Sequence, residues 1–285
     1  MIKSMTGYAN GDRLTPWGVL SCEVRAVNSR HLELNVRSPD EIRYCEPIIR
    51  AKVQGSVQRG KVEVGLRLKR DEVSAATVNE QALDRYAELA NQVHSKFPGF
   101  VTDFSRLLSL PGVLQSQELD AAGLQAEVVQ LLDETLAEFV QSRIREGQKL
   151  VTVITQRIDG IERIATQARE WVPAIREAQR TRLLARLGEI AHSVDPTRLE
   201  QEMVIAQTKL DVDEELDRLD SHIVEARRIL SLDEAVGRRL DFLMQEFNRE
   251  ANTLGSKSVD SKTSGAAVEL KVLIDQVREQ IQNLE

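Results

Sequence analysis

Two polar stretches in the last third of the sequence contain residues whose types and spacing could support chemistry. In the first, Glu215, Arg218 and His222 follow one another at intervals of three and four, so one helix face would present all three. Imidazole moves protons near neutral pH, arginine holds a phosphate through two hydrogen bonds, and glutamate can orient the imidazole or bind a cation. This trio suits RNA cleavage or phosphate positioning, although a lone helical histidine is more often structural. Asp213 is placed to cap the helix.

The second polar stretch, residues 241–257, has the sequence DFLMQEFNREANTLGSK and is predicted to be a helix. Its apolar residues provide an anchor, while its polar residues follow a helical stripe, and the stripe could equally be a solvated ion-pair face. The stripe contains Asp241, Gln245, Arg249 and Asn252, with Glu246, Glu250 and Thr253 beside it. Gly255 is expected to end the helix and to place Lys257 just beyond it, where the ammonium group could meet a phosphate.

Four carboxylates of these stretches could form an oxygen-rich site for magnesium or manganese, because hard divalent cations prefer such ligands. They are Glu215, Asp241, Glu246 and Glu250. Ion pairs of Glu246 and Glu250 with Arg249 and Arg218 are an equally open interpretation. The spacing therefore gives candidate catalytic residues Glu215, Arg218, His222, Glu246, Arg249 and Glu250.

Several other reactive classes lack their minimum sequence signals. The chain has no HExxH, paired CxxC, GxSxG or Walker sequence, which argues against zinc-protease, hydrolase-elbow and P-loop chemistry. The remaining histidines, His31, His94 and His192, are given no catalytic role. Cys22 and Cys45 are too few and too far apart for a disulfide framework or a thiolate cluster, so we expect both to be reduced and structural.

Length and composition predict a soluble, cytoplasmic protein. The 285 residues suffice for a sizeable core, no apolar run approaches the roughly 20 residues needed to cross a bilayer, and the start MIKSMTGYAN lacks a signal-peptide core. The net charge of −7 is uneven, since residues 1–70 hold 13 Lys or Arg against 7 Asp or Glu. The N-terminal part could therefore attract polyanions. So could a basic run, Arg176, Arg180, Arg182 and Arg186.

The residue pattern predicts an α+β protein: a small N-terminal β-sheet with a helix, followed by a mostly helical region with a long arm and a C-terminal helical bundle. Strands are predicted at residues 2–8, 19–27, 32–36 and 61–68, with a helix at 40–58 capped by Asp40. A further helix is predicted at 79–96, and Pro and Gly mark loops near 97–100 and 110–114. From about residue 124 the pattern is helical, with a kink at Pro173 and a break at 193–197. The predicted domains span 1–155, 156–199 for the arm, and 200–285 for the polar site.

Two apolar stripes with alternating spacings of three and four indicate helices that bury one face. The first contains Val151, Ile154, Ile158, Ile161, Ala165, Ala168 and Val172. The second contains Leu270, Ile274, Val277, Ile281 and Leu284. Burial within one chain and assembly between subunits fit the pattern equally. The neighbouring Gln280, Gln282, Asn283 and Glu285 could bond across an interface between subunits, and the candidate site could be completed there.

Five strings along the chain closely resemble the YicC family of bacterial proteins. They are SMTGYA (4–9), VRAVNSRHLEL (24–34), EELDRLDSHI (214–223), NREANTLGSKS (248–258) and REQIQNLE (278–285), and they occur in the family's order over nearly the whole chain. His31 departs from the pattern, because the family more often has an aromatic residue there. The resemblance implies a cytoplasmic endoribonuclease that cuts single-stranded RNA with a divalent cation (Mg or Mn), acts in RNA decay or small-RNA turnover, and forms a homo-oligomer, expected to be a hexamer. The alternatives are a non-catalytic RNA-binding adaptor that delivers RNA to another nuclease, and a structural helical oligomer.

Overall fold

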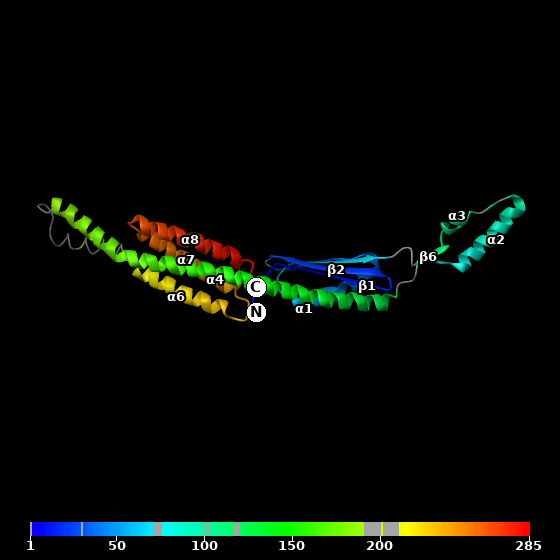
Figure 1. Cartoon of the computed structure of the whole chain (residues 1–285), viewed down its shortest axis with the longest axis horizontal. Helices are drawn as coiled ribbons and strands as arrows, with labels where there is room; N and C mark the ends of the chain where they lie inside the picture. The colour runs from blue at the N-terminus through cyan, green and yellow to red at the C-terminus, as the bar shows by residue number, and fades with distance from the viewer. Residues whose placement is uncertain are drawn as a thin grey trace.

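One long helix, α4 (Ala121–Ile190), forms the spine of the protein (Figure 1). The computed structural model describes residues 2–29, 31–70, 76–99, 101, 103–116, 120–190, 201 and 211–285. A four-stranded sheet packs along the first half of α4, and three further helices pack along the second half. The predicted α+β class is confirmed, and α4 runs without interruption across the predicted domain boundary at residue 155 and through Pro173. The predicted break at 193–197 and His192 lie outside the described residues.

The N-terminal sheet has the strand order β1 (Gly7–Thr15), β2 (Gly18–Val27), β4 (Gly60–Lys69) and β3 (Leu32–Arg37). All neighbours are antiparallel except β3 and β4, which are parallel. The prediction of a first strand at residues 2–8 is wrong, since β1 begins at Gly7 and continues to Thr15. His31 lies just before β3 and is exposed.

The parallel pair is joined by the 3-10 helix η1 (Asp40–Cys45) and by α1 (Glu46–Ser56), close to the predicted helix at 40–58. Asp40 does not cap it, because the cap position is Pro39 and no side chain bonds to the free amides there. The helices α1 and α4 cover one face of the sheet. Their core combines residues of β2, β4, η1, α1 and α4: Leu20, Cys22, Val24, Ile42, Ile49, Val53, Val62, Val64, Leu124, Val128, Leu132 and Phe139.

A four-helix bundle occupies the other half of the molecule. It contains the second half of α4 together with α6 (Asp213–Leu230), α7 (Gly237–Lys257) and α8 (Ser261–Ile281). Both predicted apolar stripes lie in its core, and only Val151 among them is half-buried. The stripes are therefore buried within one chain, and the hypothesis that the final stripe joins subunits is wrong.

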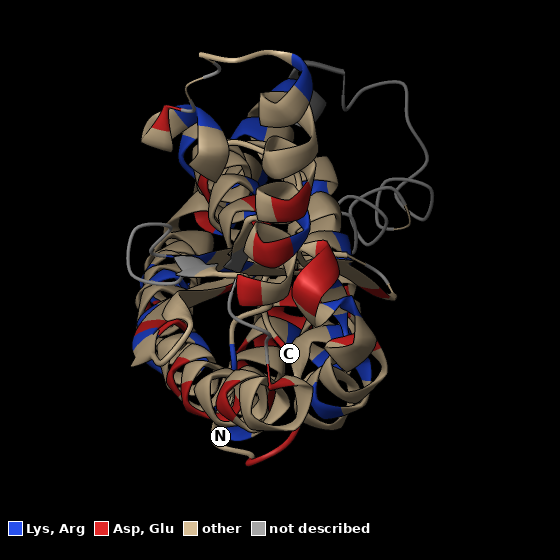
Figure 2. Ribbon diagram, turned by 90° about the vertical axis from the view of Figure 1, so that its right-hand side faces the viewer, with Lys and Arg blue, Asp and Glu red and all other residues tan. Residues whose placement is uncertain are grey.

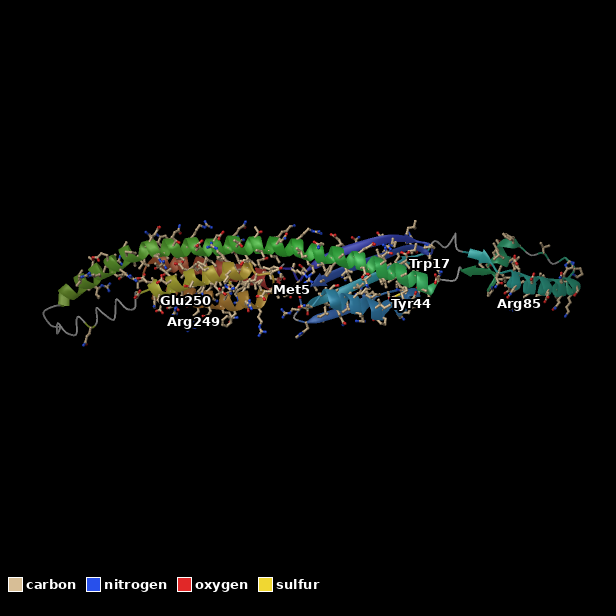
Figure 3. The ribbon with its side chains drawn as sticks, turned by 90° about the horizontal axis from the view of Figure 1, so that it is seen from below. Met5, Trp17, Tyr44, Arg85, Arg249 and Glu250 are labelled. Atoms are coloured by element: carbon tan, nitrogen blue, oxygen red, sulfur yellow. The ribbon has the colours of Figure 1, made fainter. Side chains whose placement is uncertain are left out.

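The first and last residues of the chain meet at the middle of α4 (Figure 1). Backbone hydrogen bonds join Lys3 and Glu285 in both directions at 3.1 and 2.8 Å, and Ser4 pairs with Leu284 as an isolated bridge. The buried guanidinium of Arg143 donates to the Ser4 carbonyl at 2.6 Å and pairs with the Glu285 carboxylate. Asn28 donates to the Gln282 carbonyl at 2.7 Å, and the Met5 amide donates to the Asn283 carbonyl at 2.8 Å. These contacts join the two halves of one chain. Met5 lies between the halves (Figure 3).

A small lobe projects beyond the sheet at the opposite end from the bundle (Figure 1). It contains α2 (Glu80–Lys96), α3 (Phe104–Leu108) and a two-stranded sheet of β5 (Ala76–Val78) and β6 (Leu114–Ser116). The prediction of a helix at 79–96 is confirmed, and the Asn79 side chain caps it by accepting from the Ala82 amide at 3.1 Å. Across the described ranges, helices are too short or too polar to span a membrane.

Candidate functional site

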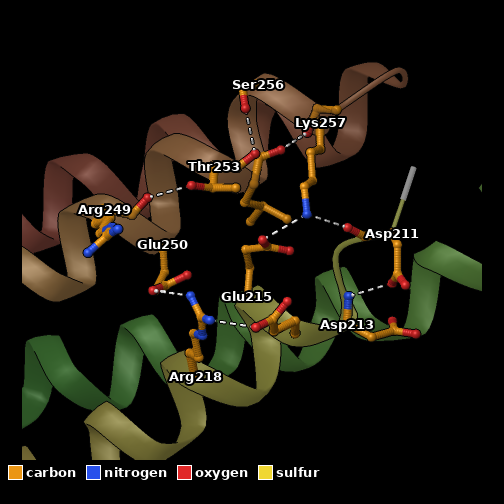
Figure 4. Close-up of polar contacts among 12 residues, drawn as sticks. Asp211, Asp213, Glu215, Arg218, Arg249, Glu250, Thr253, Ser256 and Lys257 are labelled. Carbon is orange, nitrogen blue, oxygen red and sulfur yellow. Dashed lines mark hydrogen bonds and ion pairs between the residues drawn. The ribbon is translucent and has the colours of Figure 1, made fainter. Parts of the chain in front are cut away.

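The candidate site lies where the first turns of α6 face the last turns of α7 (Figure 4). Glu215 is 4% exposed, and its Oε1 accepts a hydrogen bond from Lys257 Nζ at 2.8 Å. The same ammonium group donates to the Asp211 carbonyl at 2.8 Å. Glu215 Oε2 is buried and has no hydrogen-bond partner among the described residues. Lys257 therefore ties the start of α6 to the end of α7.

A second ion pair lies beside the first. Glu250 is 3% exposed, and Arg218 Nη1 lies 3.5 Å from its Oε1. The other end of the guanidinium bonds to Glu214, one turn earlier in α6. Half of the Arg218 side chain remains exposed, so this guanidinium can reach a solvent-borne ligand while it holds Glu250.

The apolar faces of α6 and α7 explain why these carboxylates are buried. Leu216 and Leu219 of α6 and Ala251 and Leu254 of α7 enter the bundle core. Glu215 directly precedes Leu216, and Glu250 directly precedes Ala251, so each carboxylate lies at the edge of that core. A charged group is costly to bury without a partner, and each therefore needs the cation that faces it.

The histidine of the predicted trio packs differently. His222 lies against the Phe247 ring, with ring centroids 5.5 Å apart, and its Nε2 is buried with no hydrogen-bond partner in the part of the chain that the structure describes. No described hydrogen bond links it to Glu215 or Arg218. The structure thus brings Glu215, Arg218 and Glu250 together, and keeps His222 on the apolar side.

Glu246 and Arg249 lie on the more exposed side of α7. Arg249 is 73% exposed, and its Nη1 lies 3.9 Å from Glu246 Oε2, so this pair is loose. Arg249 is visible beside Glu250 in Figure 4. Asp241 lies farther away, where its Oδ1 is 3.5 Å from Arg278 Nε and its Oδ2 accepts from Gln245 at 3.3 Å.

The four candidate metal ligands do not form one site within a chain. Asp241 and Glu250 are nine residues apart on one helix, about 14 Å along its axis, whereas ligands of Mg²⁺ lie about 2 Å from the ion. Glu215 and Glu250 each already face a cation. Across the described ranges, no three His, Cys, Asp or Glu side chains are grouped so that they could hold a metal ion. These residues therefore do not fit a divalent cation in a single chain.

The arm arginines divide into two kinds. Arg176 pairs with Asp211 at 2.9 Å and Asp213 at 3.0 Å, so it fastens the start of α6 to α4. Arg180, Arg182 and Arg186 are exposed and form no ion pair with the described residues. Only these three remain available for phosphate groups.

Two local predictions about this region were wrong. The N-cap position of α6 is Val212, and Asp213 is already helical, with its amide donating to the Asp211 carboxylate at 3.2 Å. Gly255 does not end α7, which continues to Lys257. A Cβ at Gly255 would lie 3.3 Å from Ala267 Cβ, so this glycine serves the close approach of α7 and α8. Glu214 was not among the candidate residues, although its spacing of four from Arg218 indicates an ion pair between the two side chains.

The cations of the N-terminal sheet are partly neutralised within the chain. Arg13 pairs with Glu127 and Glu134 of α4, and Lys52 pairs with Asp133. Figure 2 shows acidic and basic residues interspersed over the visible helices. On the open face of the sheet, Arg67 and Lys69 form no ion pair with the described residues. Because Arg13 and Lys52 are paired, fewer cations of the N-terminal part are available to a polyanion than the residue count suggests.

Comparisons with known proteins cover the whole chain. Residues 2–152 match the family described as "Endoribonuclease YicC-like, N-terminal region", and residues 168–285 match "Endoribonuclease YicC-like, C-terminal". The chain is 41% identical over 292 aligned positions to a protein of Haemophilus influenzae named "Probable endoribonuclease YicC", with all of both chains covered. It is 30% identical over 296 positions to a protein of the same name from Clostridioides difficile, again over all of both chains.

Proposed function

Because the chain belongs to the YicC-like endoribonuclease family, we propose that it is an endoribonuclease that cuts single-stranded RNA, with a divalent cation, in RNA decay or small-RNA turnover. The observation that carries this proposal is the match of both family regions and of full-length relatives named as probable endoribonucleases. The candidate site supports it with solvent-accessible guanidinium groups next to carboxylates, a combination that suits a phosphodiester.

The exposures of the candidate residues suggest separate roles. Arg218 and Arg249 are the accessible cations, and we assign them to the phosphate whose ester bond is cut. Glu246 is the carboxylate with the loosest partner and a 34% exposed side chain, and we assign it to proton transfer. Glu215 and Glu250 are neutralised by Lys257 and Arg218, so they position those cations. His222 would have to leave the Phe247 ring before its Nε2 could take a proton.

The divalent cation remains part of the proposal without an assigned site in the single chain. Mg²⁺ or Mn²⁺ would supply charge neutralisation at a phosphate. Because Glu215, Asp241, Glu246 and Glu250 do not converge among the described residues, none of the roles above depends on it.

The test is cleavage of an end-labelled single-stranded RNA by the highly purified full chain, with Mg²⁺, with Mn²⁺ and with EDTA. We expect internal cuts in either metal and their loss in EDTA. Arg218→Gln and Glu246→Gln should each lower the cutting rate by tenfold or more without a large change in melting temperature. The matched control is Arg239→Gln, which removes an exposed arginine of the same helix α7 that pairs with Glu234.

A non-catalytic adaptor that delivers RNA to another nuclease is the second candidate function. It is favoured by one observation, namely that both buried carboxylates of the site are already occupied by cations of the same chain. Retarded but intact RNA in the cleavage assay would support the adaptor. A protein that neither binds nor cuts RNA would support the third alternative, a structural oligomer.

We also propose that the protein forms a homo-oligomer, with a hexamer as the expected state, and that the lobe provides the contact. Among the lobe residues whose burial is described, only Val113 is a buried hydrophobic residue, which is little core for a unit of this size. A hollow of about 430 Å³ lies between α2 and α3, and the large side chains of Phe97 and Phe104 project from the same lobe with 66% and 72% exposure. The hollow and the exposed aromatic side chains could complement each other between two copies of this chain.

A further inference from the structure

A hollow of about 240 Å³ lies between α4 and the first turn of α8, outside the cluster of candidate catalytic residues. Its α4 wall is one helical stripe, in which Trp171, Ala174, Ala178 and Arg182 follow at spacings of three and four. Lys262 closes it from the α8 side. The two alanines leave the space that larger side chains would fill.

Trp171 contributes a flat aromatic wall. One side of the indole packs against the bundle core, and the residue also lines the hollow, so it is half-buried. It is one of two tryptophans in the chain. Nucleobases stack on such rings with little dependence on sequence, and each stacked base contributes about 1–3 kcal/mol.

Two cations line the same hollow as the indole. Arg182 and Lys262 are exposed and form no ion pair with the described residues, whereas nearby Arg169 and Arg176 are both paired with carboxylates. The acidic residue closest in sequence to Lys262 is Asp260, whose carboxylate is engaged by the Lys262 amide at 2.8 Å as the cap of α8. Glu170 is the other acidic residue of the rim. Both positive groups border the hollow that the indole lines, where they could contact phosphates of a strand whose base stacks there.

The hollow shares one wall residue with a smaller hollow beside the candidate site. Ile175 lines it and also lines a smaller hollow of about 20 Å³, whose other walls include Arg176 and Lys257. Lys257 in turn holds Glu215. The larger hollow therefore lies near the candidate site, one wall residue away from the hollow that Lys257 lines.

We propose that Trp171, Arg182 and Lys262 form a subsite for one nucleotide of single-stranded RNA, with the base stacked on the indole and phosphates of the same strand held by the two cations. This subsite rests on the proposed function, because it serves the strand that the endoribonuclease would cut. The volume is below the roughly 300–1,000 Å³ of a complete small-molecule pocket, so one nucleotide is the appropriate occupant. A base paired in a duplex could not enter without leaving its stack.

Fluorescence provides a direct test in the full chain. In a Trp17→Phe background, Trp171 is the sole tryptophan, and titration with a ten-nucleotide 2′-O-methyl oligouridylate in EDTA should quench its emission to saturation. Inorganic polyphosphate should compete for the cations without comparable quenching. Quenching by polyphosphate to the same extent would show a plain polyanion site and would overturn the stacking.

Variants test the same contacts by affinity, measured with a fluorescently labelled oligonucleotide. Trp171→Leu should weaken binding about 5- to 100-fold, which corresponds to the loss of one stacked base. Trp171→Phe keeps a ring and should retain most of the affinity, so it separates stacking from damage to the core. Arg182→Gln and Lys262→Gln should each flatten the salt dependence by about 0.7 in the slope of log affinity against log salt. The control Arg163→Gln changes an exposed cation of α4 outside the hollow and should have no such effect.

The outcomes separate this subsite from the proposed function. If the wild type cuts RNA and Trp171→Leu binds and cuts equally well with an unchanged melting temperature, the subsite is wrong and the endoribonuclease stands. If the oligonucleotide quenches Trp171 and the variants lose affinity, but no preparation cuts RNA, the subsite stands and the adaptor replaces the nuclease. Should Trp171→Leu fail to fold, equal binding by Arg182→Gln, Lys262→Gln and wild type would still overturn the proposal.

Discussion

Lys257 Nζ lies 2.8 Å from Oε1 of the buried Glu215 and thereby joins the last turn of α7 to the first turns of α6. The sequence predicted that Lys257 contacts a phosphate. In the structure it neutralises the carboxylate of Glu215, which is 4% exposed, and thereby stabilises the fold. Substitution of either residue leaves the other as an unpaired buried charge, which can unfold the protein. Loss of activity in such a variant must therefore be compared with its stability.

We therefore predict that Lys257→Met lowers the free energy of unfolding by about 1–3 kcal/mol, since it leaves Glu215 buried without its cation. Urea denaturation measures the change. The double variant Lys257→Met with Glu215→Met should recover part of the loss, because an apolar pair needs no compensation. Two single losses that simply add would show that the two groups do not interact. Arg249→Gln is the control, as this side chain is 73% exposed.

Gly147 of α4 should not tolerate alanine, although alanine is the better helix former. A Cβ there would lie 2.5 Å from the Ile2 carbonyl oxygen and 3.0 Å from the Lys3 backbone, so the N-terminal segment would have to move. We predict a loss of about 1–3 kcal/mol in the free energy of unfolding. Gly265 of α8 is the matched control, because a Cβ there meets nothing within 4 Å, and Gly265→Ala should stabilise by about 0.5–1 kcal/mol. Equal effects of the two substitutions would contradict the contact at Gly147.

The arm arginines should separate into binding and structural residues. Arg180→Gln and Arg186→Gln should each lower the slope of log RNA affinity against log salt by about 0.7, if both contact phosphates. Arg176→Gln should instead lower the melting temperature, because Arg176 holds Asp211 and Asp213 at the start of α6. Filter binding over a salt series and thermal melting give the two measurements. An unchanged slope in the variant that combines both exposed substitutions would remove the arm from the RNA-binding surface.

Sequence reasoning succeeded where one local pattern decides the structure. The apolar stripes at spacings of three and four predicted the core of the bundle, and Ile158, Ile161 and Ile274 are fully buried there. The predicted bounds of the first strand were wrong, because β1 continues through Asn10, Asp12 and Arg13, and polar residues of this kind do not indicate a strand. Their strand conformation comes from pairing with β2, and such tertiary pairing overrides propensity.

The candidate site was predictable only in part for the same reason. Helical spacing places Glu215 and Arg218 on one face of α6, but the partner of each depends on which turn of α7 lies opposite. The structure pairs Glu215 with Lys257 and Arg218 with Glu250, and it directs His222 to Phe247. Spacing within one helix could not have distinguished these pairs from a shared metal site. Trp171 belongs to a hollow formed by two helices that are distant in sequence, and no local signal indicates it.

Alkaline stability should depend on Cys22, whose burial raises the pKa of the thiol to about 11. The unfolded thiol has a pKa near 8.5, so between these values the unfolded state binds fewer protons, and stability falls as pH rises. We predict that the difference in unfolding free energy between pH 8 and pH 10 is smaller in Cys22→Ala than in the wild type. The effect of this group is at most about 1.4 kcal/mol per pH unit. Parallel pH curves for the two proteins would contradict the buried, protonated thiol.

The lobe should control assembly without contributing to the bundle. Phe97 and Phe104 are 66% and 72% exposed, and burying such rings against a second copy would stabilise the oligomer by about 1.5–3 kcal/mol each. Phe97→Ser together with Phe104→Ser should therefore shift the protein to smaller species in light scattering at micromolar concentration. The matched control is Phe242→Ser, which removes a 64% exposed ring from α7. The melting temperature of the bundle should stay the same in both variants. An unchanged oligomer in the lobe variant would exclude these rings from the interface, and dissociation by Phe242→Ser would place the interface on the bundle instead.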